Sequence, residues 1–129
     1  MPLEDSTYPE DWLPIAKKDL GRVDLMLDSA DADGAGFYLQ QSLEKYLKAF
    51  LLSKGWRLRR IHNLELLLND ALAYDSSLEE FRALCQEVTD YYMLDRYPFM
   101  GSAGITIEDV KEAMDGAKRL IERLGYRLT

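Results

Sequence analysis

The sequence predicts an all-α protein, an up-and-down antiparallel bundle of four to five helices, for three reasons. Apolar residues recur every three or four positions in five separate segments, which is the spacing of one helical face. The sequence has no runs of alternating polar and apolar residues, the pattern of half-buried strands. Loops of roughly 3 to 10 residues join the predicted helices, and such short loops favour antiparallel neighbours.

Two long helices are predicted first, and the second of them is the most apolar of the five. The first spans about residues 11–30, and Pro14 lies in its first turn, where a missing N–H costs little. Residues 31–34, Asp-Ala-Asp-Gly, have the composition of a turn and end it. The second helix spans about residues 35–54, and Gly55 is well placed to cap its C-terminus.

Three further helices follow a connector, and the first of these is short. The third is predicted over about residues 62–73. The fourth begins at a capping box over residues 76–79, Ser-Ser-Leu-Glu, and runs to about Asp95, because Pro98 disfavours helical geometry before it. A related capping pattern over residues 106–109 opens the fifth helix.

Length and composition indicate one folded domain. We assign residues 11–127 to a single domain and residues 1–10 to a polar N-terminal extension. The chain is 47% hydrophobic and 30% charged, as is usual for a folded protein. It has neither the layout of a signal peptide nor an apolar run near the roughly 20 residues that cross a bilayer. We therefore expect a cytoplasmic protein that does not bind membranes.

The single cysteine and single histidine exclude several kinds of site. One cysteine cannot form an internal disulfide, and Cys85 falls on an apolar helical stripe, where we expect a packed core residue. Cys85 and His62 together fall short of a structural zinc site. We therefore expect neither a metal nor a cofactor.

Charge is concentrated in one segment. The net charge of −7 argues against a broadly basic nucleic-acid-binding surface. Residues 45–62 nevertheless carry six basic residues and no acidic one. Such an island of positive charge is a plausible anion site, because the local potential matters more than the net charge. The six basic residues are Lys45, Lys48, Lys54, Arg57, Arg59 and Arg60.

Three segments, in order and spacing, resemble the HEPN family of helical domains. Trp12-Leu13 followed by Ala-Lys-Lys-Asp-Leu at residues 16–20 is similar to its opening helix. Residues 37–50, Phe-Tyr-Leu-Gln-Gln-Ser-Leu-Glu-Lys-Tyr-Leu-Lys-Ala-Phe, resemble its most recognisable helix. Ile-His-Asn-Leu at residues 61–64, paired with Tyr-Tyr-Met-Leu-Asp-Arg-Tyr-Pro at residues 91–98, is similar to its third-helix entry and its tyrosine-rich closing motif.

The resemblance implies a four- or five-helix bundle that is often a homodimer. It also implies a partner, because many bacterial members are encoded beside a minimal nucleotidyltransferase and act with it as a two-component, often toxin–antitoxin, pair. A subset of the family are metal-independent ribonucleases. They use an Arg-x(4 to 6)-His motif that is usually completed across the dimer interface.

Arg57 and His62 match the ribonuclease motif formally, with four residues between them. A histidine supplies a proton acceptor near neutral pH, and an arginine supplies fixed positive charge for a phosphate. Arg59 and Arg60 would then add electrostatic capture of the RNA. The pattern is permissive in so basic a segment, and the family's ribonuclease motif lies near a later helix. The alternative is that His62 begins the third helix and hydrogen-bonds locally.

A second candidate site lies at the end of the fourth predicted helix. Arg96 could bind phosphate, or act as the catalytic arginine, while Tyr91, Tyr92 and Tyr97 face a base or a partner. Alternatively, Asp95 and Arg96 form a structural ion pair and the tyrosines belong to the half-buried core.

A polar stripe within the second helix is the third candidate. Gln40, Gln41 and Glu44 could line a groove or a dimer seam. Lys45 and Lys48 could bind phosphate, or could lie on a solvated face, with Lys48 paired to Glu44 four residues before it.

Three hypotheses for function follow. The leading one is a homodimeric module that binds a nucleotidyltransferase partner or a nucleotide-bearing ligand. The second is a metal-independent RNA endonuclease, a toxin that uses Arg57 or Arg96 with His62. The third is a structural helical bundle without a ligand site.

Overall fold

A computed structural model describes residues 2–96 and 104–128, and for residues 92–96 it describes only the course of the helix. Helices and the loops between them make up these residues, and strands are absent from the described ranges. The elements, in chain order, are η1 (Leu3–Asp5), α1 (Pro9–Asp28), α2 (Ala32–Ser53), α3 (Leu64–Leu72), η2 (Ser76–Phe81), α4 (Arg82–Arg96) and α5 (Ile107–Arg123), where η marks a 3-10 helix.

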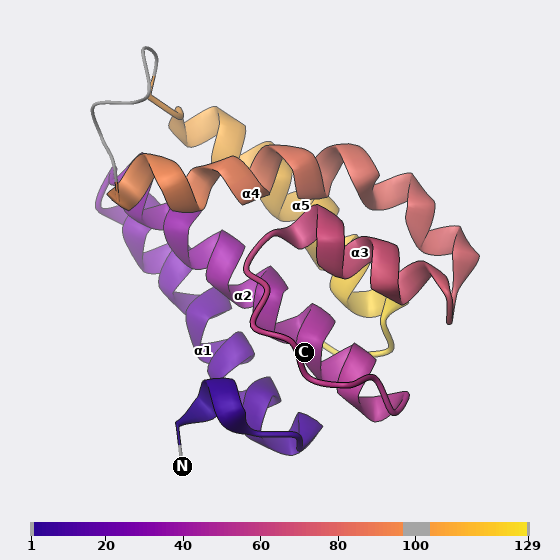
Figure 1. Ribbon diagram of the computed structural model, residues 1–129. Helices are drawn as coiled ribbons and strands as arrows, with labels where there is room; N and C mark the ends of the chain where they lie inside the picture. The colour runs from indigo at the N-terminus through magenta and orange to yellow at the C-terminus, as the bar shows by residue number, and fades with distance from the viewer. Residues whose placement is uncertain (1, 97–103, 129) are drawn as a thin grey trace.

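The helix α2 lies at the centre of the bundle (Figure 1). It packs along α1 on one side and contacts α3, α4 and α5 on the others. One continuous core joins all five helices, with leucines of α2 and α3 that are entirely buried. The predicted all-α bundle is confirmed. The helices in the described part of the chain are too short or too polar to cross a membrane.

The hairpin of α1 and α2 differs from the prediction at its turn. The helix α1 begins at Pro9, so Pro14 lies beyond its first turn rather than within it. The helix α2 begins at Ala32, because the Asp31 carboxylate accepts a hydrogen bond from the backbone N–H of Gly34 and caps the helix. The predicted turn over residues 31–34 is therefore wrong, and the chain reverses just before Asp31.

The caps of the later helices are right in one case and wrong in another. Thr106 and Asp109 form the predicted capping box of α5. The predicted box at Ser76 is not formed, because the carboxylate of Asp75 accepts from the backbone of Ser77 and caps η2 instead. The chain then makes a 3-10 turn before α4 begins at Arg82.

The start of the chain is docked against the bundle. The Trp12 indole N–H donates to the carbonyl of Ser6 at 3.0 Å, and Ser6 is buried. Arg60 forms an ion pair with Asp5, which joins this segment to the connector before α3. Elsewhere, Cys85 is fully buried in the core as predicted, and burial raises the pKa of its thiol to about 12.

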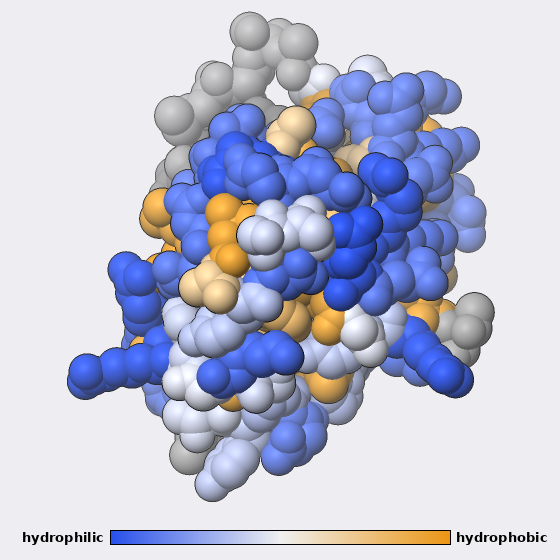
Figure 2. Space-filling view, turned by 90° about the vertical axis from the view of Figure 1, so that its right-hand side faces the viewer, coloured by the Kyte–Doolittle hydropathy of each residue, from blue (hydrophilic) through white to orange (hydrophobic). Residues whose placement is uncertain are grey.

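Hydrophilic residues cover most of the face that carries the turn between α3 and α4 (Figure 2). Apolar residues on that face form small groups separated by polar ones. The polar contacts that distinguish this domain from a plain helical bundle lie elsewhere, along α2.

Candidate functional site

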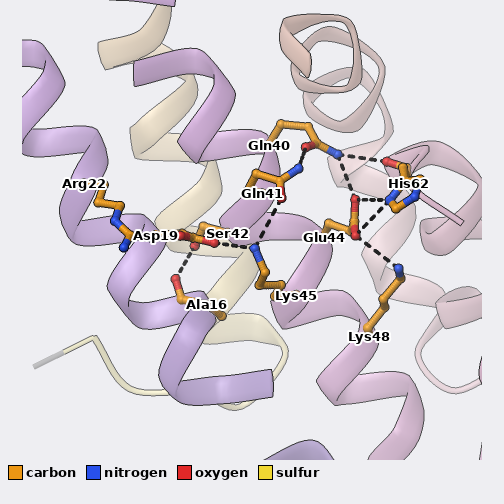
Figure 3. Close-up of polar contacts among 10 residues, drawn as sticks. All are labelled: Ala16, Asp19, Arg22, Gln40, Gln41, Ser42, Glu44, Lys45, Lys48 and His62. Atoms are coloured by element: carbon orange, nitrogen blue, oxygen red, sulfur yellow. Dashed lines mark hydrogen bonds and ion pairs between the residues drawn. The ribbon is translucent and has the colours of Figure 1, made fainter. Parts of the chain in front are cut away.

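A band of polar and charged side chains runs along α2, between α1 and the connector that leads to α3 (Figure 3). Two carboxylates anchor it. Glu44 of α2 is 5% exposed, and Asp19 of α1 is 2% exposed. Each is surrounded by cations and amides, and we call the two groups the Glu44 cluster and the Asp19 cluster.

The Glu44 cluster begins with an ion pair inside the protein. Lys48 Nζ donates to Glu44 Oε2 at 3.1 Å, one helical turn along α2. Lys48 is only 2% exposed, and its Nζ lies 5.2 Å from the centroid of the Trp12 ring. The expectation that Lys48 lies on a solvated face is therefore wrong, because Trp12 packs over it.

His62 also belongs to the Glu44 cluster, which contacts its ring at Nδ1 and its backbone carbonyl. His62 Nδ1 lies 3.1 Å from Glu44 Oε1, and Gln40 Nε2 donates to the backbone carbonyl of His62 at 2.9 Å. An ionised carboxylate can only accept, so Nδ1 carries the proton that it shares with Glu44. In the neutral ring Nε2 is then the proton acceptor. The side chain of His62 is 55% exposed.

His62 therefore precedes α3 and contacts Glu44 and Gln40 of α2. The helix begins two residues later, and Asn63 caps it by accepting from the backbone of Glu65 and Leu66. The prediction that His62 starts the third helix is wrong. Its hydrogen bonds to Glu44 and Gln40 join it to α2. They fix the imidazole at Nδ1, while the rest of the ring is exposed.

In the Asp19 cluster, both cations are paired with the carboxylate of Asp19. Asp19 accepts from Arg22 Nη1 at 2.7 Å and forms a short ion pair with Lys45. Lys45 also donates to Gln41 Oε1 at 3.3 Å, and its side chain is mostly buried. The expectation that Lys45 lies on a solvated face is therefore also wrong. The two clusters are linked, because Gln41 Nε2 donates to Gln40 Oε1 at 2.7 Å.

Asp19 and Arg22 were not among the residues that the sequence predicted for a site. A signal was present, because Asp19 stands beside Leu20 within the apolar spacing of Trp12, Ala16 and Val23 on α1. An acid on the buried face of an amphipathic helix needs a partner. One partner, Arg22, follows three residues later on α1, and the other, Lys45, comes from α2 at a distance in sequence that no local pattern reveals.

Comparison with known proteins identifies the fold family. The chain matches the HEPN domain over residues 9–126. It belongs to the HEPN family. TT1696 from Thermus thermophilus has a similar crystal structure, with a TM-score of 0.79 and 29% identity over 90% of this chain and 94% of that one. ST0689, an archaeal HEPN homologue, gives a TM-score of 0.72 and 24% identity over 91% and 94% of the two chains. No curated protein sequence matches the chain.

In this HEPN domain the six cations of residues 45–62 do not form one open basic surface. Two are paired within the clusters, Arg59 pairs with Asp70 at 3.4 Å, and Arg60 pairs with Asp5. Lys54 Nζ lies 5.4 Å from the centre of the Phe50 ring. Four of the six cations are therefore paired with acids, three from other segments and one, Lys48, with Glu44 of its own helix. Phosphate binding by these cations stays a prediction.

Of the residues predicted for a ribonuclease site, the structure describes His62 and Arg57 but not the side chain of Arg96. His62 is anchored as described, and Arg57 is exposed on the same connector without an ion pair to any described residue. Tyr91 is 3% exposed, so it belongs to the core and does not face a base or a partner. Burial, followed by the Glu87 carboxylate, raises the pKa of its hydroxyl. The side chains of Tyr92, Asp95 and Arg96, and the whole of Tyr97, lie outside the described residues.

The HEPN domain brings together no group of three metal-ligating side chains among its described residues. The two clusters bring together an imidazole, two carboxylates and two side-chain amides.

Proposed function

We propose that this HEPN domain is a homodimeric binding module that recognises a nucleotide-bearing ligand through His62 and works with a minimal nucleotidyltransferase partner. The observation that carries the proposal is the way His62 is held. A buried carboxylate fixes Nδ1, a buried amide fixes the backbone carbonyl, and the rest of the ring is half exposed. A side chain fixed before binding loses less entropy when a ligand arrives.

Binding is favoured over catalysis because the neighbouring cations are already paired. Phosphoryl chemistry needs positive charge aimed at the oxygens on which negative charge develops. Lys48 is committed to Glu44, Lys45 to Asp19, and Arg60 to Asp5. These pairs leave the site suited to recognition by hydrogen bonds. The nucleotidyltransferase partner rests on the resemblance to two-component members of the family.

His62 is the only histidine of the chain, so its Hε1 ring proton gives an NMR signal that no other histidine overlaps. We expect titration with ATP to shift that signal in a saturable way. We expect His62→Ala to abolish binding measured by calorimetry, and Lys111→Ala, an exposed change on α5, to leave it intact. No shift at millimolar ATP, or equal binding by His62→Ala, would contradict nucleotide recognition. Sedimentation of the wild type tests the dimer, and a monomer at all concentrations contradicts it.

A metal-independent ribonuclease is the second candidate, and the contact between His62 Nδ1 and Glu44 favours it. Nε2 of the neutral ring would take the proton of a ribose 2′-hydroxyl, and the exposed Arg57 would meet the phosphate. We expect such activity to cleave total RNA in EDTA and to be lost in His62→Ala and weakened in Arg57→Ala. Folded, dimeric protein that leaves RNA intact would eliminate this candidate for the domain acting alone.

A further inference from the structure

One face of α1 has no partner within the described chain. The helix packs along α2 at the edge of the bundle, and α2 is the one helix with which it packs closely (Figure 1). A groove of about 810 Å³ separates it from α5 and the tail that follows. The exposed residues of this face recur three and four positions apart. They are Lys17, Lys18, Gly21, Asp24, Leu25 and Asp28.

Gly21 lies at the centre of this face, and neither packing nor backbone conformation in the described part of the chain requires a glycine there. A Cβ atom at this position would meet nothing within 4 Å, and the backbone does not have a positive φ. A glycine in the middle of a helix costs about 1 kcal/mol relative to alanine. Glycine on an exposed helical face allows another helix to approach closely. Leu25, one turn further on, is 61% exposed.

The charges beside Gly21 are complementary to those of a second, antiparallel copy of α1. Lys17 precedes Gly21 by one turn and Asp24 follows it by nearly one, and both lie on the edge that lines the groove. Neither forms an ion pair within the described residues. When two copies of α1 lie antiparallel about a two-fold axis beside Gly21, Lys17 of each faces Asp24 of the other. On the opposite edge, the stem of Lys18 lies against Leu25 of the other copy.

We propose that this face of α1 is the homodimer contact, where a second copy of the chain packs its own α1 antiparallel across Gly21. A two-fold contact uses the same patch on both copies, so each charge pair occurs twice. The partner's α1 lies along the groove beside α5. This inference rests on the dimer proposed above and names its surface.

Cross-linking tests the geometry directly. Gly21→Cys brings two thiols together at the axis, where a disulfide needs Cα atoms about 4.4 to 6.8 Å apart. We expect mild oxidation at low protein concentration to convert most of this variant to a covalent dimer. The buried Cys85 makes the wild type a matched blank, and Lys111→Cys places an exposed thiol on α5 as a control for random collision. Equal cross-linking of the two variants would overturn the proposed axis.

Charge reversal tests the pairing. We expect Lys17→Glu and Asp24→Lys each to raise the dimer dissociation constant about tenfold, because each change turns two attractions into repulsions. The double variant restores the pairs with reversed signs and should return to near the wild-type constant. Gly21→Ala should weaken the dimer while raising the melting temperature of the dilute, monomeric protein, which separates loss of contact from loss of fold.

The two proposals fail differently. Wild-type protein that sediments as a monomer at every concentration overturns both the dimer and this surface. A stable dimer whose dissociation constant is unchanged by Lys17→Glu, Asp24→Lys and Gly21→Ala overturns the surface alone and leaves the proposed dimer standing.

Discussion

Two polar networks of this domain use the same chemistry in opposite surroundings. The Glu44 cluster is buried along α2 and ends at His62. The second network centres on Arg82 at the start of α4, where the guanidinium donates to Glu65 of α3 at 2.9 Å, to Glu79 of η2 at 2.7 Å and to Asn69 at 2.7 Å. We call it the Arg82 cluster.

The Arg82 cluster has as many hydrogen bonds as the Glu44 cluster, but its side chains are partly exposed, by 28% for Arg82, 34% for Glu65 and 55% for Glu79. Water can replace each partner, so the cluster joins three elements of the surface at little net gain. In the Glu44 cluster no water replaces a lost partner, and removal of one charge leaves the other stranded. Burial, and not the number of bonds, separates a surface ion-pair group from a network on which the fold depends.

The largest expected effect follows from Glu44→Ala. It leaves Lys48 buried without its carboxylate, and we expect a loss of about 3–5 kcal/mol in the free energy of unfolding, measured by urea denaturation. Glu79→Ala in the Arg82 cluster is the matched control, and we expect its denaturation midpoint to stay near that of the wild type. A double change, Glu44→Leu with Lys48→Met, should recover most of the loss. Equal losses for Glu44→Ala and Glu79→Ala would end the distinction between the clusters.

The sequence predicted the helices better than it predicted which ion pairs are buried and which are exposed. Periodicity depends on local spacing, so five helices and the Thr106 cap could be read directly. The Glu44–Lys48 pattern is identical on an exposed and on a buried helical face. Only the packing of Trp12 and of the connector, which comes from tertiary structure, shows that this pair is buried. The same packing turns His62 from a helix-entry residue into the exposed end of a network.

An intermediate effect is expected for Asp19→Asn. Lys45 and Arg22 lose their shared carboxylate, but the Arg22 side chain is partly exposed and Lys45 keeps Gln41 as a partner. We expect a loss of about 1–3 kcal/mol, which is the usual cost of an unsatisfied buried group. Because Asp19 is linked to His62 only indirectly, through Lys45, Gln41 and Gln40, we expect ATP binding by the variant to match that of the wild type. A loss of binding without a loss of stability would assign Asp19 to the ligand site instead.

The smallest effect is a dependence on pH in the Arg82 cluster. The hydrogen bond from Gln86, followed by that from Arg82, lowers the pKa of Glu65, and the hydrogen bond from Arg82 lowers the pKa of Glu79. A carboxyl whose pKa is lower in the folded than in the unfolded state stabilises the fold fully above its unfolded pKa, about 4.3. That stabilisation is lost as the pH falls through the folded pKa.

Arg82→Ala should therefore lower the urea midpoint slightly at pH 7 and bring it close to that of the wild type near pH 3. Lys111→Ala is the control, because it removes one exposed positive charge that forms no ion pair with the described residues. We expect the difference between its urea midpoint and that of the wild type to stay the same from pH 7 to pH 3. If the deficit of Arg82→Ala were the same at pH 3 and pH 7, its cause would be lost packing of the arginine stem.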